Sequence, residues 1–376
     1  MRLRPLTLAT VFSVQIGAAS HLLVAQDPPR NPPTDPNAYA FNDSHFHLTN
    51  YIQEGLTLPK FVEMMGKTVG RVALFGIPLQ QEWSHRVDGE TAPSYYLNSD
   101  SPLYYYSFTD AMIAMAYRAL PAEAQARFDP MITGFNPADM YAAAHIRRVL
   151  KTFPGVFTGI GEFTIHKEFV SPKVAGTPAS LMDPALDSIL SFAGQVGLVV
   201  IMHNDVNVPF AKPGSAEASL NLPSAPAVPE YLAQMKALLE RHPNTTVIWA
   251  HTGLGRTVRP ISDHVKMLAA LIGDPKLPNL YFDISWKVVS DYVTASDSSL
   301  AATANLFNRY PDRFLFGTDA LSPPDTAAYL EVFHAYAPLW KRLTPEASQK
   351  IRIGNYLTLF DQARRRVRAW ERANTP

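Results

Sequence analysis

The chain has 376 residues, 47% of them hydrophobic and 18% charged, and its 33 Lys and Arg residues balance 33 Asp and Glu residues. This neutrality gives no support for a nucleic-acid partner, which normally requires a basic excess. No cysteine is present, so disulfides are excluded and any metal must be bound by histidine and carboxylate groups.

The first 40 residues are predicted to contain an export leader and a tether. Residues 1–4 are basic, and an apolar stretch with small residues follows, as in a secretory signal peptide. The apolar stretch is too short for a comfortable membrane span of about 20 residues, although a retained anchor is the alternative. We therefore expect a signal peptide over 1–25, a Pro-rich linker over 26–40, and a periplasmic or secreted protein without stable membrane insertion.

From residue 41 to 376, short apolar runs alternate with longer amphipathic stretches, which is the pattern of repeated βα units and a parallel sheet. The eight predicted strands are 41–48, 71–77, 129–134, 156–165, 198–203, 246–251, 280–284 and 314–318. The predicted helices include 58–69, 139–152, 184–196, 229–241, 258–272 and 298–310. Eight strands favour a single (β/α)8 TIM-barrel domain over a doubly wound sheet, whose phosphate-binding glycine turn we do not find.

Two insertions are predicted, after the second and fifth strands. The first, 80–127, is rich in tyrosine, and its rings either cover the mouth of the pocket or form a small satellite core, which is favoured. The second, 207–229, is rich in Pro, Ala and Ser and is either a lid or a surface excursion. Neither insertion identifies a ligand.

A basic cluster, Arg364 to Arg366 with Arg368, lies in a predicted C-terminal helix. The interpretation favoured for such a cluster is a solvated helix face, and a binding role is the alternative. The basic cluster therefore gives no additional support for binding to nucleic acid.

Polar residues follow the predicted strands at their carboxyl ends. In a parallel barrel these ends meet at one face, so the side chains would converge on one axial pocket. Side chains at i and i+2 of a strand point to the same side, so the first two histidines can bind one ion. A lone histidine in an apolar segment is usually a core or surface residue. Six polar residues that all fall at the carboxyl ends of predicted strands instead favour a functional site. The six residues are His45, His47, Glu162, His203, His251 and Asp319.

The motifs at these positions resemble those of the amidohydrolase superfamily, in particular its amidohydrolase-related branch of metal-dependent barrels. A single His-x-His motif is weak, whereas the ordered set spans about 320 residues and is specific. The resemblance implies a divalent metal, commonly zinc. The matching segments are DSHFH at 43–47, GE at 161–162, MHN at 202–204, WAHTG at 249–253, FGTD at 316–319 and IGNYLTLF at 353–360.

The resemblance also implies one or two ions, and a glutamate at position 162 favours two. The two histidines of the first strand would hold one ion, and His203 with His251 would hold the second. Glu162 would bridge the ions, and Asp319 would contact the first ion and the attacking water. The alternative is that Glu162 orients His203 without binding metal.

Imidazole and carboxylate ligands suit a Lewis acid without a redox role, which lowers the pKa of bound water to about 7. The expected function is hydrolysis of a small ester, lactone or amide by metal-activated water, with Asp319 and His251 as catalytic residues. The first alternative is a nonoxidative decarboxylase or related lyase on the same barrel. The second is a catalytically inactive barrel that binds a metal or a ligand.

Four basic residues near the predicted strand ends are candidates to bind an anionic group of the small-molecule substrate: His166, Lys167, Arg256 and Lys287. Loops that follow barrel strands form the rim of the pocket, but for each of these residues a surface role is favoured over substrate binding. Asp205 either orients His203 or caps the following turn. The sequence does not indicate an oligomeric state.

Overall fold

The computed structural model describes residues 38–50, 54–78, 108–167, 173–174, 177–208 and 229–374. The predicted signal peptide, most of the predicted linker and most of the second insertion lie outside the described residues. The same holds for the tyrosine-rich part of the first insertion, which contains Tyr95, Tyr96, Tyr104, Tyr105 and Tyr106. Among the helices in the described ranges, none combines the length and the apolar character that crossing a bilayer requires.

Nine parallel strands of the described residues form one sheet, in the order β10-β9-β8-β7-β4-β3-β2-β1-β11. A short antiparallel pair, β5 (Lys173–Val174) and β6 (Thr177–Pro178), lies apart from this sheet. The strands of the main sheet are β1 (Phe41–His47), β2 (Val69–Phe75), β3 (Phe128–Ile132), β4 (Gly159–Thr164), β7 (Val199–His203), β8 (Val247–Trp249), β9 (Leu280–Asp283), β10 (Phe314–Leu315) and β11 (Ala320–Leu321). All eight predicted strands are present.

The two ends of the sheet are joined through one chain segment, 314–321. Its first part, β10, pairs with β9, and its last part, β11, pairs with β1. Between them, Leu315 accepts a backbone hydrogen bond from Ile284, and Asp319 donates one of 2.8 Å to the carbonyl of His45. The eighth predicted strand therefore closes the sheet, and the prediction of a TIM barrel is confirmed.

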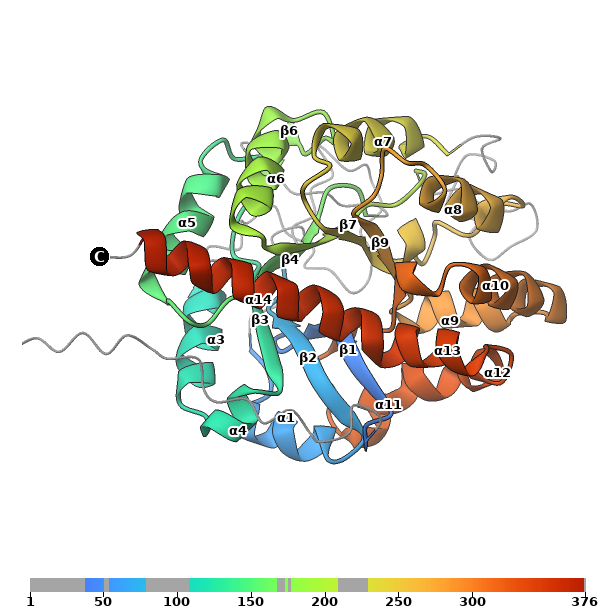
Figure 1. The fold of residues 1–376 in the computed structure, drawn as a ribbon, viewed down its shortest axis with the longest axis horizontal. Coiled ribbons are helices and arrows are strands. Elements are labelled where there is room, and N and C mark those ends of the chain that lie inside the picture. Colours follow the sequence, from blue (N-terminus) through green and yellow to red (C-terminus); the bar gives the residue numbers. More distant parts are fainter. Residues whose placement is uncertain are drawn as a thin grey trace, which may run out of the picture.

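Helices surround the strands (Figure 1). They are α1 (Leu58–Met65), α3 (Phe108–Arg118), α4 (Ala122–Gln125), α5 (Ala142–Thr152), α6 (Pro184–Val196), α7 (Leu232–Arg241), α8 (His264–Ile272), α9 (Lys287–Thr294), α10 (Asp297–Arg309), α11 (Thr326–Ala335), α12 (Ala337–Trp340), α13 (Pro345–Gln349) and α14 (Asn355–Asn374). All six predicted helices form. Helix α8 begins at His264 instead of 258, and Pro260 accounts for part of this difference because it disfavours helical backbone at residue 259.

The interior of the barrel is a packed core, and α14 contributes to it. Alternate residues of a strand point to opposite faces, so one set from each strand points inward. Figure 1 shows α14 crossing the sheet, with its N-terminal half beside the strands. The buried cluster comprises Ala73, Phe75, Met131, Val199, Ile201, Ile248, Ala250 and Leu315 together with Tyr356, Leu359, Phe360 and Ala363 of α14.

The basic cluster of α14 differs from its prediction. Arg364 and Arg368 are buried, because α14 lies across the N-terminal ends of the strands, where carbonyl groups need donors. Arg364 donates to the carbonyl of Phe128 at 2.9 Å and pairs with Asp129. Arg368 donates to the carbonyl of Phe157 at 3.1 Å. The prediction of a solvated face is therefore wrong for these two arginines.

We expect Arg364→Ala to lower the free energy of unfolding by about 3 kcal/mol, because it removes one partner of the fully buried carboxylate of Asp129. The neighbouring Arg365 is exposed, so Arg365→Ala should change stability by about 0.5 kcal/mol or less. Urea unfolding followed by circular dichroism measures both variants. Equal losses would contradict a structural role for the Arg364–Asp129 pair.

Candidate metal centre

The structure brings all six predicted site residues together at the C-terminal end of the barrel. Three overlapping groups of these residues place one possible ligand atom each within 4.8 Å of the others. The groups are His45 with His251 and Asp319; His45 with His47 and Glu162; and Glu162 with His203 and His251. The described residues therefore contain side chains that could hold a metal ion.

The local backbone that presents these side chains is unusual. The predicted strand 246–251 ends at Trp249, and His251 lies in the following turn with a φ of 57°. Asp319 has a φ of 52° between β10 and β11. A positive φ costs a non-glycine residue about 1–3 kcal/mol, and residues with this strained backbone cluster at functional sites. At Gly161, beside Glu162, φ is 126° and a Cβ would lie 2.3 Å from the carbonyl oxygen of Ile201, so glycine is required.

The first half of the site contains the two histidines of β1. Their Nε2 atoms lie 3.7 Å (His45) and 3.4 Å (His47) from Oε2 of Glu162. The same two atoms lie 3.3 Å and 3.2 Å from Oδ1 of Asp319. Two imidazole nitrogens and two carboxylate oxygens thus surround one position.

The second half of the site faces the other oxygen of Glu162. Oε1 lies 2.9 Å from Nδ1 of His203 and 3.4 Å from Nε2 of His251. The second oxygen of Asp319 lies 3.9 Å from Nε2 of His251. Glu162 therefore stands between two histidine pairs, which fits a bridging carboxylate. Its 2.9 Å contact also fits the alternative, in which it orients His203.

Each of the four histidine rings uses its outer nitrogen in a hydrogen bond. Such bonds fix the tautomer and direct the other nitrogen toward a metal. The outer partners are Asp283 for His45 at 2.9 Å, the carbonyl of Gly76 for His47 at 2.9 Å, Asp205 for His203 at 3.0 Å and Ser285 for His251 at 2.8 Å. Of the two roles weighed for Asp205, this geometry matches orientation of His203.

Asp283, at the end of β9, is a site residue that the sequence analysis missed. Its side chain is fully buried, and its Oδ1 accepts the backbone N–H of His251 at 2.8 Å. Its Oδ2 contacts His45, so one carboxylate supports a histidine in each half of the site. The sequence did contain a signal for it, because Asp283, like the other site residues, is a polar residue near the carboxyl end of a predicted strand, 280–284.

The electrostatics of the centre favour a bound cation. Burial by itself lowers the pKa of His45, but Asp283, Glu162 and Asp319 raise it well above its usual value. Burial acts to raise the pKa of Glu162, yet Lys167 and His45 hold it well below the usual range. The carboxylates therefore remain charged in a buried site and require positive charge nearby, which a protonated histidine or a bound cation can supply.

Two buried atoms of the centre support the same conclusion. The Nε2 atoms of His45 and His251 have no hydrogen-bond partner, although buried polar nitrogens are normally paired. Both atoms point toward the acids of the centre. Imidazole and carboxylate groups in this arrangement match the ligands of a divalent metal such as zinc.

The four basic candidates for substrate binding occupy different environments. The side-chain nitrogen of Lys167 lies 5.5 Å from the ring centre of Trp286, and the guanidinium carbon of Arg256 lies 5.6 Å from it. Lys287 pairs with Asp291 on α9, away from these contacts. His166 stacks on Tyr231 with ring centres 3.9 Å apart, and burial lowers its pKa to about 4. The sequence analysis did not single out Trp286, whose ring both Lys167 and Arg256 approach.

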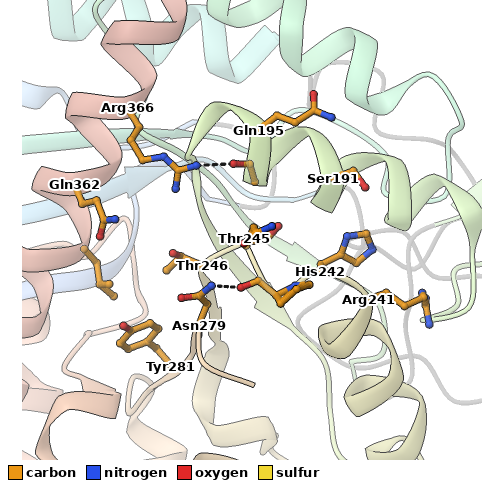
Figure 2. A pocket seen from close by; sticks show the side chains of 14 residues that line it. Ser191, Gln195, Arg241, His242, Thr245, Thr246, Asn279, Tyr281, Gln362 and Arg366 are labelled. Carbon is orange, nitrogen blue, oxygen red and sulfur yellow. Dashed lines mark hydrogen bonds between the residues drawn. The ribbon is translucent and has the colours of Figure 1, made fainter. Parts of the chain in front are cut away.

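A separate cavity of about 620 Å³ lies between α6, the turn before β8, the start of β9 and α14 (Figure 2). Its lining is polar, and Arg366 crosses one wall to donate to the carbonyl of Gly194 at 2.7 Å. None of the six predicted site residues lines it. This cavity is therefore distinct from the candidate metal centre.

Comparisons with known proteins give one family and several similar structures. A family model described as amidohydrolase matches residues 43–361. An uncharacterised TIM-barrel protein of Bordetella bronchiseptica has a TM-score of 0.51 and 18% identity, covering 86% of this chain and 99% of that chain. At such low identity these structures show a shared fold alone. The comparison with curated proteins gave no match.

Two further structures resemble the chain equally well. The 2,6-dihydroxybenzoate decarboxylase from Rhizobium has a TM-score of 0.50 and 15% identity, with 86% of this chain and 99% of that chain covered. A probable 2-pyrone-4,6-dicarboxylic acid hydrolase from Acinetobacter baumannii has a TM-score of 0.50 and 13% identity, with the same coverage.

We expect Asp283→Asn to weaken the binding of a divalent metal, tested with zinc, by about 10- to 100-fold, the range found when partners of metal-binding histidines are removed. The amide oxygen can still accept the N–H of His251, which leaves the amide nitrogen facing Nδ1 of His45. That nitrogen donates, so the ring proton moves to Nε2 and blocks the ligand position. Competition with a chromophoric chelator measures affinity, with the exposed Asp263→Asn as control. Wild-type affinity in Asp283→Asn would contradict the role.

Proposed function

This chain belongs to the amidohydrolase family, and from that premise we propose that it is a metal-dependent hydrolase of a small ester, lactone or amide. The observation that carries the proposal is the position of Glu162 between two histidine pairs. One oxygen of Glu162 faces each histidine pair, so this carboxylate could be shared by two ions. The family includes both hydrolases and decarboxylases, so the residues of the centre must decide between them.

The histidines of β1 would hold the first ion together with Asp319, and His203 and His251 would hold the second, with Glu162 shared. Zinc is the proposed metal, because it takes imidazole and carboxylate ligands at neutral pH. When bound, the metal would supply a Lewis acid that lowers the pKa of a water and polarises the carbonyl that reacts.

Asp319 is proposed to accept a proton from the attacking water and to return it to the leaving group. Its side chain is 13% exposed, whereas those of the other five residues are at most 5% exposed, so it is the acid nearest to incoming substrate. Burial acts to raise its pKa, but His45 and His251 hold the pKa well below the usual range. The carboxylate is thus ionised and able to accept a proton.

His251 is proposed to help stabilise the oxygen that becomes negative during the reaction, through the second ion that its Nε2 would hold. Its Nε2 lies in the buried centre without a hydrogen-bond partner, and its Nδ1 is held by Ser285. The ring is therefore fixed before a substrate arrives. Such fixed groups act without reorganisation, which is why they contribute strongly to catalysis.

The second candidate function is a nonoxidative decarboxylase, which the similarity in fold to 2,6-dihydroxybenzoate decarboxylase brings into consideration. Glu162 favours hydrolysis, because the resemblance associates single-ion decarboxylases with the absence of a bridging group. An inactive binding barrel is the third candidate. Retention of an acid at Asp319 beside four histidines argues against it.

The test of the function is a screen of zinc-loaded protein against esters, lactones, amides and aromatic carboxylates. We expect acid release without carbon dioxide, and loss of turnover when a chelator removes the metal. Carbon dioxide release from a carboxylate would support the lyase instead. Absence of any turnover, with two zinc ions bound per chain, would support the binding barrel.

We expect Asp319→Asn to lower kcat by about 10²- to 10⁴-fold, because an amide cannot accept the proton of the attacking water. The metal content should fall less than activity, since the histidines and Glu162 remain. Steady-state kinetics and metal analysis on the same preparation separate the two effects. The exposed Asp312→Asn variant is the control. A metal-loaded Asp319→Asn enzyme with a wild-type kcat would refute the assignment.

A further inference from the structure

Asp110, in the first turn of α3, is a buried carboxylate outside the six site residues. An acid in the first turn of a helix commonly interacts with the N–H groups and the dipole of its own helix. Both oxygens of Asp110 instead accept backbone N–H groups of the segment that follows β3. Oδ1 accepts that of Thr133 and Oδ2 accepts that of Gly134, each at 2.9 Å. The carboxylate therefore holds two consecutive residues of another element.

Thr133 connects this contact to the metal centre. Its side chain is fully buried, and its hydroxyl donates to the backbone carbonyl of Glu162 at 2.7 Å. Asp110, Thr133 and Glu162 thus form a continuous chain of hydrogen bonds. It runs from helix α3 to the residue whose carboxylate lies between the two histidine pairs.

Regular sheet pairing does not fix the backbone of Glu162. The pairing of β3 with β4 ends at Ile132 and Ile160, two residues before Glu162. The pairing of β4 with β7 shifts its register between Ile160 and Phe163. The hydroxyl of Thr133 therefore holds β4 at a position that both neighbouring strands leave out.

The position of Glu162 has little tolerance. Its two oxygens lie between 2.9 Å and 3.7 Å from a nitrogen of each of the four histidines. Distances between a metal and its ligands vary by only about 0.2 Å, so a small shift of β4 changes the fit to an ion. A bond that fixes the carbonyl of Glu162 therefore matters for the whole centre.

The charge of Asp110 is costly to stability. Burial raises its pKa to about 7, although the two N–H groups act to lower it, and no charged group of the described residues contributes to this shift. His145 of α5 also interacts with Gly134, but burial lowers its pKa, so it adds no charge at neutral pH. A proton on Asp110 turns one acceptor oxygen into a donor, so both N–H groups are held fully only by the ionised form.

We propose that Asp110 is a positioning residue for Glu162, which acts through Thr133 to hold β4 so that the shared carboxylate faces both histidine pairs. The proposal rests on the proposed function only in taking Glu162 as a metal ligand. It extends the centre to helix α3, which supplies none of the six candidate ligands. An acid that lowers stability while it holds a site is an instance of the trade-off between stability and function.

The hydroxyl of Thr133 is tested with two variants. Thr133→Val removes it with little change in shape, whereas Thr133→Ser retains it. Zinc affinity, measured by competition with a chromophoric chelator, should fall about tenfold or more in Thr133→Val and stay within about twofold of the wild type in Thr133→Ser. The exposed hydroxyl of Thr152 donates to the carbonyl of Arg148 at 2.8 Å, so Thr152→Val is the matched control. Wild-type affinity in Thr133→Val would overturn the proposal.

A double-mutant cycle tests whether Asp110 acts through Thr133. Asp110→Asn keeps one acceptor oxygen but presents an amide donor to the other N–H group. At pH 8 we expect it to weaken zinc binding about tenfold, and the double variant with Thr133→Val to bind within about twofold of Thr133→Val alone, because residues in one hydrogen-bond network are not additive. Additive losses, about 100-fold together, would refute this path. The control is Asp325→Asn, whose exposed carboxylate accepts the N–H of Ala328.

The pH dependence separates positioning from stabilisation. A carboxyl with a higher pKa in the folded than in the unfolded chain lowers stability as the pH rises toward the folded pKa, because only the native state still holds the proton. From pH 6 to 8, the urea midpoint of the metal-free wild type should therefore fall relative to Asp110→Asn. The zinc affinity of the wild type should rise relative to the same variant. Midpoint and affinity that change in the same direction would indicate a purely structural role.

These measurements also distinguish the proposal from the proposed function. A wild-type protein that binds zinc but hydrolyses no substrate would refute the proposed function, while the cycle of variants still decides the role of Asp110. A wild-type protein that binds no divalent metal would overturn both.

Discussion

The hydrogen bonds that tie residues 314–321 to both β9 and β1 are the constraint on which the centre depends. They set Asp319 beside the two histidines of β1, because its backbone N–H donates to the carbonyl of His45 at 2.8 Å. Without this closure, the acid from the end of the chain and the histidines from its beginning would lie at opposite edges of an open sheet. The parallel direction of the strands in the main sheet then places Glu162, His203 and His251 at the same end.

Much of this arrangement could be predicted from the sequence because its signals are local. Apolar runs mark buried parallel strands, and the polar residue that follows each run marks the end where a barrel site forms. The same reasoning could not identify Trp286, whose position depends on a backbone of positive φ and on two cations from other loops. It also misplaced Arg364, since the pattern of a helix does not reveal that its polar side meets a buried acid.

The charges of the site are concentrated in its buried interior. The acids Glu162, Asp319 and Asp283 stand among imidazole rings, and a bound cation would compensate them. Lys167 and Arg256 lie further out, against the indole of Trp286.

The long terminal helix α14 occupies the end of the barrel opposite the metal centre, and Glu371 near its last turn accepts the backbone N–H of Gly155 ahead of β4. Anything fused after this helix would therefore extend from the face that carries no proposed chemistry. Attachment to a solid support through the carboxyl terminus would keep the catalytic mouth open to solution.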